Sequence, residues 1–247
     1  MRADTKTYLI LAAGIVLVAA AAFATAVFGA MELRAHPSAA GPSALDKPTY
    51  DNDGFPEVDW AAWQEVNPDI CAWITIPGTN VDLPVVQASA DSPTYYLTHD
   101  VYGNYNVYGA VYVDAGCEQG TGSDAPILFG HHMDDGTMFA DVAKYTDWDF
   151  AREHRRVLIQ TPTSKYTLGV RSAVIVPGWE ASKRTTFTDH QDFESWYGDY
   201  LTRADMTLDK NPHLTQAFTL ITCSYNRFAN ERTLVFAAPI DTYEQEK

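Results

Sequence analysis

Basic residues are scarce in this chain of 247 residues. It holds 17 Lys and Arg against 32 Asp and Glu, which gives a formal net charge of -15 at pH 7. Residues 1–31 carry a net charge of +1, so the remainder carries -16. This balance argues against binding to nucleic acid or to anionic lipid through the folded part, because both partners are negatively charged.

Long apolar runs are absent except near the N-terminus. Residues 8–31 are almost entirely Leu, Ile, Val, Ala and Phe, a length that can cross a bilayer as a helix. Arg2 and Lys6 precede the run, which predicts the N-terminus inside and the bulk of the chain outside. A cleaved signal peptide is the alternative, since 24–26 and 28–30 offer small-residue cleavage patterns. The length of the run favours an uncleaved, single-pass anchor in the cell membrane, and both versions export the domain.

Internal repeats are absent as well, and the rest of the chain divides simply. Residues 32–56 are rich in Pro, Ala, Ser, Gly and Asp, which is typical of a linker. Residues 57–247 are one domain's worth of chain, long enough for a full core.

Cysteine is also rare, with only Cys71, Cys117 and Cys223 present. An exported domain meets oxidising surroundings, so a Cys71–Cys117 disulfide that leaves Cys223 free is a hypothesis to consider. Nothing in the spacing recommends that pairing, and Cys71, beside a strand start, is expected to be a buried thiol.

The dominant pattern of the exported part is a series of short apolar runs separated by Gly, Pro, Asn and Asp. This spacing predicts an all-β barrel or sandwich. The predicted strands cover residues 72–76, 81–87, 108–113, 127–129, 157–160, 166–170, 172–176, 219–225 and 232–236.

Three segments have helical periodicity instead. Residues 59–67 predict a short helix with Trp60, Trp63 and Val66 on one face, and residues 137–145 predict a second. Residues 188–203 predict a third helix with an aromatic stripe, which we interpret as core packing. The stripe consists of Phe193, Trp196, Tyr197 and Tyr200.

The last two predicted strands place a thiol near a guanidinium. Cys223 lies where the first of them gives way to a loop, and Arg232 lies where the second begins. A nearby cation favours the thiolate, the nucleophilic form of cysteine. Taken alone, a buried structural cysteine and a solvated arginine explain these residues better.

A histidine changes that balance. Residues 127–129 form a short apolar strand that Gly130 ends, and His131 follows at the strand terminus. Histidine is the usual proton shuttle near neutral pH. His131, Cys223 and Arg232 together predict acyl transfer, with proton shuttle, nucleophile and oxyanion partner.

These blocks resemble the sortases, cysteine transpeptidases of Gram-positive cell surfaces, and most of all their class B. The resemblance rests on residues 219–223 with Arg232 nine positions on, on 127–141 around His131, and on 67–87. It runs from about Trp60 to about Ala238 and implies a closed eight-stranded β-barrel. It also implies an N-terminal helix and a helix-containing connection before the last strands.

The resemblance implies a function as well. A sortase cleaves a C-terminal sorting motif of a secreted protein through a cysteine thioester and joins it to an amine, here expected from a cell-wall precursor or a pilin lysine. No metal or organic cofactor is expected. Thr222, Ser224 and Tyr225 are the predicted substrate-binding residues beside the catalytic Cys223, His131 and Arg232.

Alternatives remain for two of the roles. His132 rivals His131 as the catalytic histidine, and only the family pattern favours His131. Arg227 rivals Arg232, which is preferred because it opens the final apolar strand. A metal site at His131 and His132 is disfavoured, since adjacent strand residues point to opposite faces.

Other functions compete with wall anchoring. A surface cysteine protease would use the same residues, and a membrane-tethered binding domain would leave Cys223 merely packed. The L,D-transpeptidases place His and Cys much closer together than the 92 positions between His131 and Cys223. No apolar segment lies near Lys247 and no lid motif lies between Glu32 and Asp59, which favours class B over a pilin-polymerising sortase.

Overall fold

The computed structural model describes residues 48–180, 183–224 and 230–240. These residues belong to the unit Leu45–Lys247. The predicted anchor at residues 1–31 and most of the predicted linker lie outside the described ranges. Within those ranges, no helix combines the length and the apolar character needed to span a bilayer.

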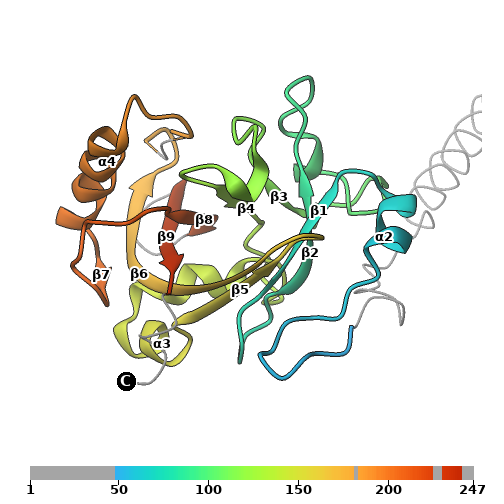
Figure 1. The fold of residues 1–247 in the computed structure, drawn as a ribbon, viewed down its shortest axis with the longest axis horizontal. Coiled ribbons are helices and arrows are strands. Elements are labelled where there is room, and N and C mark those ends of the chain that lie inside the picture. The colour runs from blue at the N-terminus through green and yellow to red at the C-terminus, as the bar shows by residue number, and fades with distance from the viewer. Residues whose placement is uncertain (1–47, 181–182, 225–229, 241–247) are drawn as a thin grey trace, which may run out of the picture. The chain divides into compact units, whose positions relative to one another are not determined.

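A closed β-barrel forms the body of this unit (Figure 1). The strands follow one another in the order β5-β1-β2-β3-β4-β8-β9-β6, and a further pairing of β5 with β6 closes the ring. This confirms the eight-stranded barrel that the resemblance implied. The described strands are β1 (Ile70–Thr75), β2 (Asp82–Gln87), β3 (Val111–Val113), β4 (Ile127–Phe129), β5 (Arg156–Gln160), β6 (Lys165–Pro177), β7 (Met206–Thr207), β8 (Phe218–Ser224) and β9 (Glu231–Pro239).

Strand β6 is longer than the sequence suggested. Residues 166–170 and 172–176 were expected as two strands, but Lys165–Pro177 is continuous. Its pairing with β9 shifts register between Val170 and Ser172. An extra residue of this kind bends a strand without ending it, so β6 can pair with β5 over its first part and with β9 over the rest. The two-residue β7 adds to its edge and was not predicted.

The helices are short, except one, and lie around the barrel (Figure 1). The helix expected over residues 137–145 is instead a 3-10 helix, Ala140–Thr146, and the following α3 was not predicted. The described helices are α2 (Trp60–Val66), α3 (Trp148–Glu153) and α4 (His190–Thr202), with further 3-10 turns at Tyr95–Leu97 and Gly120–Gly122.

Helix α2 matches its predicted position but not its predicted face. The Asp59 carboxylate caps it by accepting the Ala62 N–H at 3.1 Å. Trp60 and Trp63 pack partly against the barrel, whereas Val66 is 54% exposed. Of the three residues predicted to form the apolar face, only Trp60 and Trp63 therefore pack against the barrel.

Helix α4 confirms the predicted core packing. Its four stripe aromatics are all buried, and three of them surround Phe236 of β9, with ring centroids between 5.1 and 5.8 Å from it. The Asp189 carboxylate caps the helix by accepting the Asp192 N–H at 2.9 Å. The helix thus covers the outer face of β9 and fixes the strand that carries Arg232.

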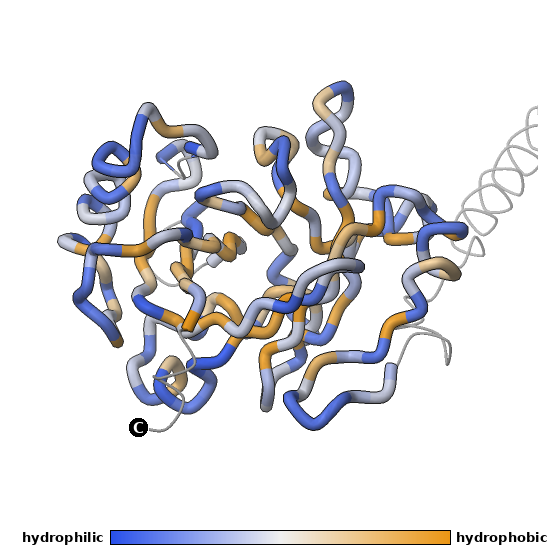
Figure 2. The backbone as a smooth tube through the Cα atoms, viewed as in Figure 1, coloured by the Kyte–Doolittle hydropathy of each residue, from blue (hydrophilic) through white to orange (hydrophobic). Residues whose placement is uncertain are grey.

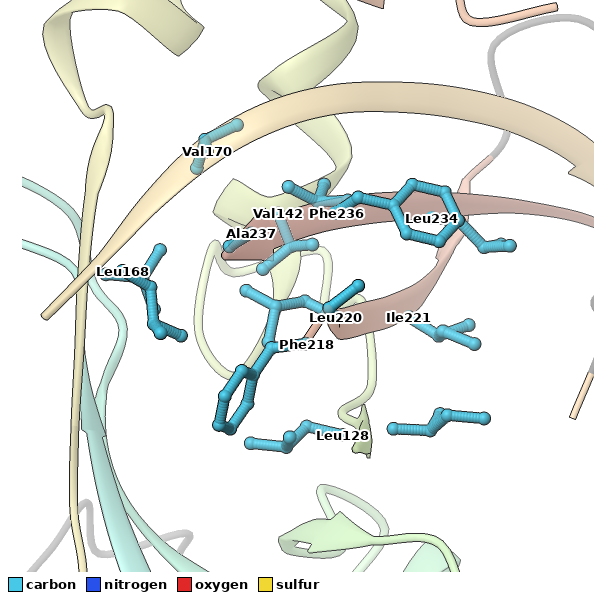
Figure 3. Close-up of a cluster of buried hydrophobic side chains, with 14 of the residues drawn as sticks. Leu128, Val142, Leu168, Val170, Phe218, Leu220, Ile221, Leu234, Phe236 and Ala237 are labelled. Atoms are coloured by element: carbon cyan, nitrogen blue, oxygen red, sulfur yellow. The ribbon is translucent and has the colours of Figure 1, made fainter. Parts of the chain in front are cut away.

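Buried hydrophobic side chains of β4, β6, β8 and β9 form one cluster (Figure 3), and hydrophobic segments follow the barrel strands in Figure 2. Leu128 of β4 and Leu220 of β8 are fully buried and face each other in the register of these parallel strands. Burial of side chains of this size stabilises a fold by about 1.5–3 kcal/mol each. The core therefore holds β4 and β8 together just before their polar ends.

Candidate active site

Cys223 and Arg232 are direct partners at the end of the β8–β9 pair. Their Cα atoms are in register in the antiparallel ladder, which places such atoms about 4.5–5.5 Å apart. Cys223 is the penultimate residue of β8, and Arg232 is the second residue of β9. The sequence prediction that the thiol and the guanidinium project from neighbouring strand ends is confirmed.

The alternation of side chains along β8 and the position near the strand end together explain why Cys223 reaches the surface. Successive residues of a strand point to opposite faces. Leu220 and Thr222 share one face of β8 and are buried, whereas Cys223 is on the other face. Ile221, earlier on the face of Cys223, is also buried, so Cys223 is partly exposed because it lies close to the strand end. The thiol is thus held by a rigid strand but remains accessible.

Arg232 is held in part by its own strand. Its Nη1 donates to the backbone oxygen of Glu231 at 2.9 Å. Glu231 itself is fully buried on the opposite face of β9. This hydrogen bond therefore holds the Arg232 guanidinium in place on the strand position that pairs with Cys223.

The parallel neighbour β4 delivers the histidines. It pairs with β8 up to Phe129 and Ile221, and the Gly130 N–H then donates to the Ile221 oxygen at 3.2 Å. A Cβ atom at Gly130 would lie 2.6 Å from the Phe139 ring, so only glycine fits this close approach. On the buried side, the Thr222 hydroxyl donates to the Gly130 oxygen at 2.9 Å.

His131 and His132 point in different directions, as expected for adjacent residues of an extended segment. His131 Nε2 lies 2.8 Å from the Leu97 carbonyl oxygen, and His132 Nδ1 lies 2.9 Å from the Cys223 carbonyl oxygen. The two rings therefore engage separate backbone carbonyls.

The contact with Leu97 determines which nitrogen of His131 can exchange a proton. A carbonyl oxygen only accepts hydrogen bonds, so Nε2 must carry a hydrogen. Nδ1 is then the lone-pair nitrogen of the neutral ring. Sequence reasoning missed Leu97, because a backbone carbonyl in a single 3-10 turn leaves no pattern of side chains.

Aromatic and charged groups border this site on the β3 side. The Tyr112 ring stacks on Phe129 with centroids 5.3 Å apart. Burial, with contributions from Asp114 and Cys223, raises the pKa of Tyr112 to about 12. The phenol therefore stays protonated near neutral pH and cannot serve there as a base.

The connection between β6 and α4 reaches this border through Lys183. Its ammonium lies 3.1 Å from an Asp114 carboxylate oxygen and 5.0 Å from the centroid of the Phe129 ring. Phe129 directly precedes Gly130 and His131, so this contact ties the connection to the strand that carries the histidines. No pattern in the sequence signals it, since Lys183 and Asp114 are far apart in the chain.

The structure describes two of the three predicted substrate-binding residues, Thr222 and Ser224. The Thr222 and Ser224 side chains are buried, so they are interior groups rather than the lining of an open surface. Tyr225 and Arg227 lie outside the described residues, and their predicted roles stay predictions.

The remaining cysteines make other contacts: Cys71 Sγ lies 3.6 Å from the Val85 oxygen, and Cys117 Sγ lies 3.8 Å from the Ala125 oxygen. Cys71 and Cys117 are both free thiols in the structure, without the disulfide considered above. The Cys71 residue is partly exposed to solvent, but its thiol is desolvated, which raises the pKa of Cys71 to about 12. Burial raises the pKa of Cys117 to about 11. Both therefore remain thiols at neutral pH.

A closed β-barrel with cysteine, histidine and arginine gathered at the ends of β8, β4 and β9 defines a class of cysteine enzyme. The chain matches the sortase domain family over residues 74–240, and it belongs to the sortase family. The resemblance seen in the sequence is thereby confirmed, including its class B character.

Relatives of known identity support the class. Sortase B of Staphylococcus aureus is 27% identical over 178 residues, which cover 72% of each chain. The structure of Clostridium perfringens sortase B superposes with a TM-score of 0.67 at 27% identity, over 73% of this chain and 99% of that one. A Staphylococcus aureus sortase B–substrate complex superposes with a TM-score of 0.65 at 26% identity, over 74% and 84% of the two chains. The protein is thus a class B-like sortase, a cysteine transpeptidase.

Proposed function

We propose that this sortase cleaves a C-terminal sorting motif of a secreted protein and joins the new carboxyl end to an amine of a cell-wall peptidoglycan precursor. The observation that carries the proposal is the direct pairing of Cys223 with Arg232 beside the loop of His131. The likeness to a Staphylococcus aureus sortase B–substrate complex supports a sorting-motif substrate.

In the first half of the reaction, the Cys223 thiolate attacks the carbonyl carbon of a threonine-like residue of the motif. Arg232 binds the developing oxyanion, and one well-placed donor of this kind contributes about 3–4 kcal/mol to transition-state stabilisation. His131, protonated on Nδ1, gives that proton to the leaving amine as the C–N bond breaks. A thioester to Cys223 and a free amine result.

In the second half, the acceptor amine attacks the thioester carbonyl carbon. The Nδ1 lone pair of His131 takes a proton from the attacking nitrogen. The C–S bond then breaks, Cys223 leaves as a thiolate and the new amide departs. Both halves proceed without a metal or an organic cofactor.

The proposed location is the cell membrane, with a single N-terminal span and the catalytic domain outside. The apolar run at residues 8–31 and the basic Arg2 and Lys6 before it support this orientation. Protease added to intact cells should digest the C-terminal domain. Protection of that domain until the membrane is opened would contradict the orientation.

Product analysis tests the reaction. The full chain is incubated with a library of sorting-type peptides, with and without an added amine, and the products are identified by mass spectrometry. We expect an amine-capped product that disappears in Cys223→Ala. Release of free acid alone, even with abundant amine, would indicate a protease. A product formed only with a lysine-bearing pilin segment would indicate a polymerising sortase, and no product with an unreactive Cys223 would indicate a binding domain.

A further inference from the structure

Beyond the end of β4, the His132 side chain makes the next hydrogen bond to the backbone of β8. The Gly130 N–H donates to the Ile221 oxygen at 3.2 Å, which is the last backbone contact of this kind from β4 to β8. Carbonyls two residues apart on a strand project from the same edge. The next β8 carbonyl on this edge is therefore that of Cys223, and His132 Nδ1 meets it at 2.9 Å.

This contact has a defined direction. The Cys223 oxygen only accepts, so His132 Nδ1 must donate. Both the neutral Nδ1–H form and the imidazolium can do so, and the bond survives a change in protonation of the ring. The buried Thr222 hydroxyl contact with the Gly130 oxygen lies one residue earlier on β8, so residues 130–132 are joined to β8 by two further contacts at neighbouring positions.

We propose that His132 is a positioning residue, whose Nδ1–H fixes the backbone of Cys223 against the loop that carries His131. The inference rests on the proposed function. Strand β8 ends at Ser224, one residue beyond Cys223, so the Cys223 carbonyl belongs to the last part of the strand. Misplacement of a reacting group by about 1 Å can slow a reaction about 10²-fold.

This assignment divides the work between the two histidines. His132 joins the loop to the nucleophile's own backbone, while His131 is oriented from the other side by the Leu97 carbonyl. His131 then keeps Nδ1 for proton transfer. The alternative that His132 is the proton shuttle would require it to act with Nδ1 already bound to the Cys223 carbonyl.

Substitutions that mimic one ring nitrogen at a time separate these possibilities. In His132→Asn the side-chain amide nitrogen occupies a position like that of Nδ1, whereas in His132→Gln it reaches toward the position of Nε2. Each full-length variant, with His132→Ala, is tested in single-turnover acylation by a sorting peptide. Amide hydrogen exchange of Phe218–Ser224 and the melting temperature are measured in parallel.

We expect the alanine and glutamine variants to acylate about 10- to 100-fold more slowly, with faster exchange in Phe218–Ser224. The asparagine variant should restore acylation to within about threefold, with the exchange and the pH profile of the wild type. If the alanine variant is too unstable to assay, the asparagine and glutamine variants decide the question between them.

Three results would overturn the proposal. They are an asparagine variant as slow as alanine, rescue by glutamine instead, or an alanine variant with wild-type acylation and exchange. A failure of the proposed function looks different, because the wild type itself would form no thioester. The exchange measurement would then still test the contact between His132 and Cys223.

Discussion

Cys223 and Arg232 face each other as one register pair of the β8–β9 ladder, on strands whose other faces are buried. A cross-strand pair holds its side chains in a fixed relation without help from a flexible loop. The nucleophile and the group proposed to bind the oxyanion are therefore aligned by strand pairing itself.

Replacing Arg232 by lysine should be severe although the charge is kept. Lysine lacks the planar set of donors that a guanidinium presents. We expect thioester formation to slow by about 10²- to 10³-fold, the loss typical of removing one oxyanion donor, with an unchanged melting temperature. The matched control is Arg156→Lys on β5, where the arginine donates to the Asp53 oxygen at the surface. Equal rates for the two variants would contradict the role of Arg232.

Gly109 should be irreplaceable because it supports the segment that orients His131. Its φ of +60° is unfavourable for other residues, and a Cβ atom there would lie 2.4 Å from the Tyr96 oxygen and 3.2 Å from His131 Cδ2. We expect Gly109→Ala to cost about 1–3 kcal/mol of stability and to slow acylation more than tenfold. Urea unfolding and single-turnover kinetics measure the two effects.

Gly198 supplies the matched control for that substitution. It lies within α4, and apart from the helix's own backbone and the adjacent residues, no described heavy atom lies within 4 Å of a Cβ atom built there. Alanine is a better helix former than glycine, so Gly198→Ala should stabilise the protein by about 0.5–1 kcal/mol. Acylation should be unchanged. Similar losses in both variants would show that the contacts of Gly109 are not the cause.

The contact between Lys183 and Asp114 should matter for stability and for substrate binding. The Asp114 side chain is only 9% exposed, against 52% for Lys183. Lys183→Met would leave the carboxylate without this partner, which we expect to cost about 1–3 kcal/mol. Adding Asp114→Asn should recover part of that loss, as a double-mutant cycle can measure. Additive losses of stability in the two variants would contradict the coupling. For the effect on substrate binding, we expect Lys183→Met to raise KM by a larger factor than it lowers kcat.

Asp141 should make the stability of the protein depend on pH in the acid range. It is buried, accepts the Asn80 N–H at 2.7 Å and pairs with Lys144 at 2.7 Å. Burial opposes ionisation, but these two contacts outweigh it and hold the pKa of Asp141 below its usual value. The stabilisation is therefore fully present above about pH 4, the usual aspartate pKa, and is lost as the pH falls below it.

Urea unfolding of Asp141→Asn checks this dependence. We expect the variant to be less stable than the wild type by about 1–3 kcal/mol at pH 7, and the difference should shrink toward pH 3. The exposed Asp91→Asn should match the wild type at pH 7. A stability difference that is equal at pH 7 and pH 3 would contradict the assignment.

The sequence predicted the strands and the pairing of Cys223 with Arg232 because both depend on local patterns. The choice of a closed barrel over a sandwich came from the resemblance to the sortases. Alternating apolar residues mark strands, and residues at the facing ends of two adjacent strands meet across the connecting turn. By contrast, β7 has two residues and α3 has six, too few to show a period. The continuity of β6 depends on a bulge that breaks the alternation at Arg171.

The orientation of the histidines could be predicted only in part. Alternation indicates that His131 and His132 diverge, but it does not indicate which one meets Cys223. That depends on the Leu97 carbonyl and on the end of the β4–β8 ladder, which are backbone features formed by distant segments. The contact of Lys183 with Asp114 is of the same kind, because it depends on the three-dimensional path of a connection.

The central claim is that Cys223 is the residue that carries the acyl group. The most direct measurement traps the acyl-enzyme of the full chain with a sorting peptide in the absence of amine, and locates the added mass by peptide mapping. The account predicts the mass on the peptide that contains Cys223, with none on those that contain Cys71 or Cys117, and its loss on addition of amine. An adduct on either of the other cysteines, or a Cys223 adduct that no amine can release, would contradict it.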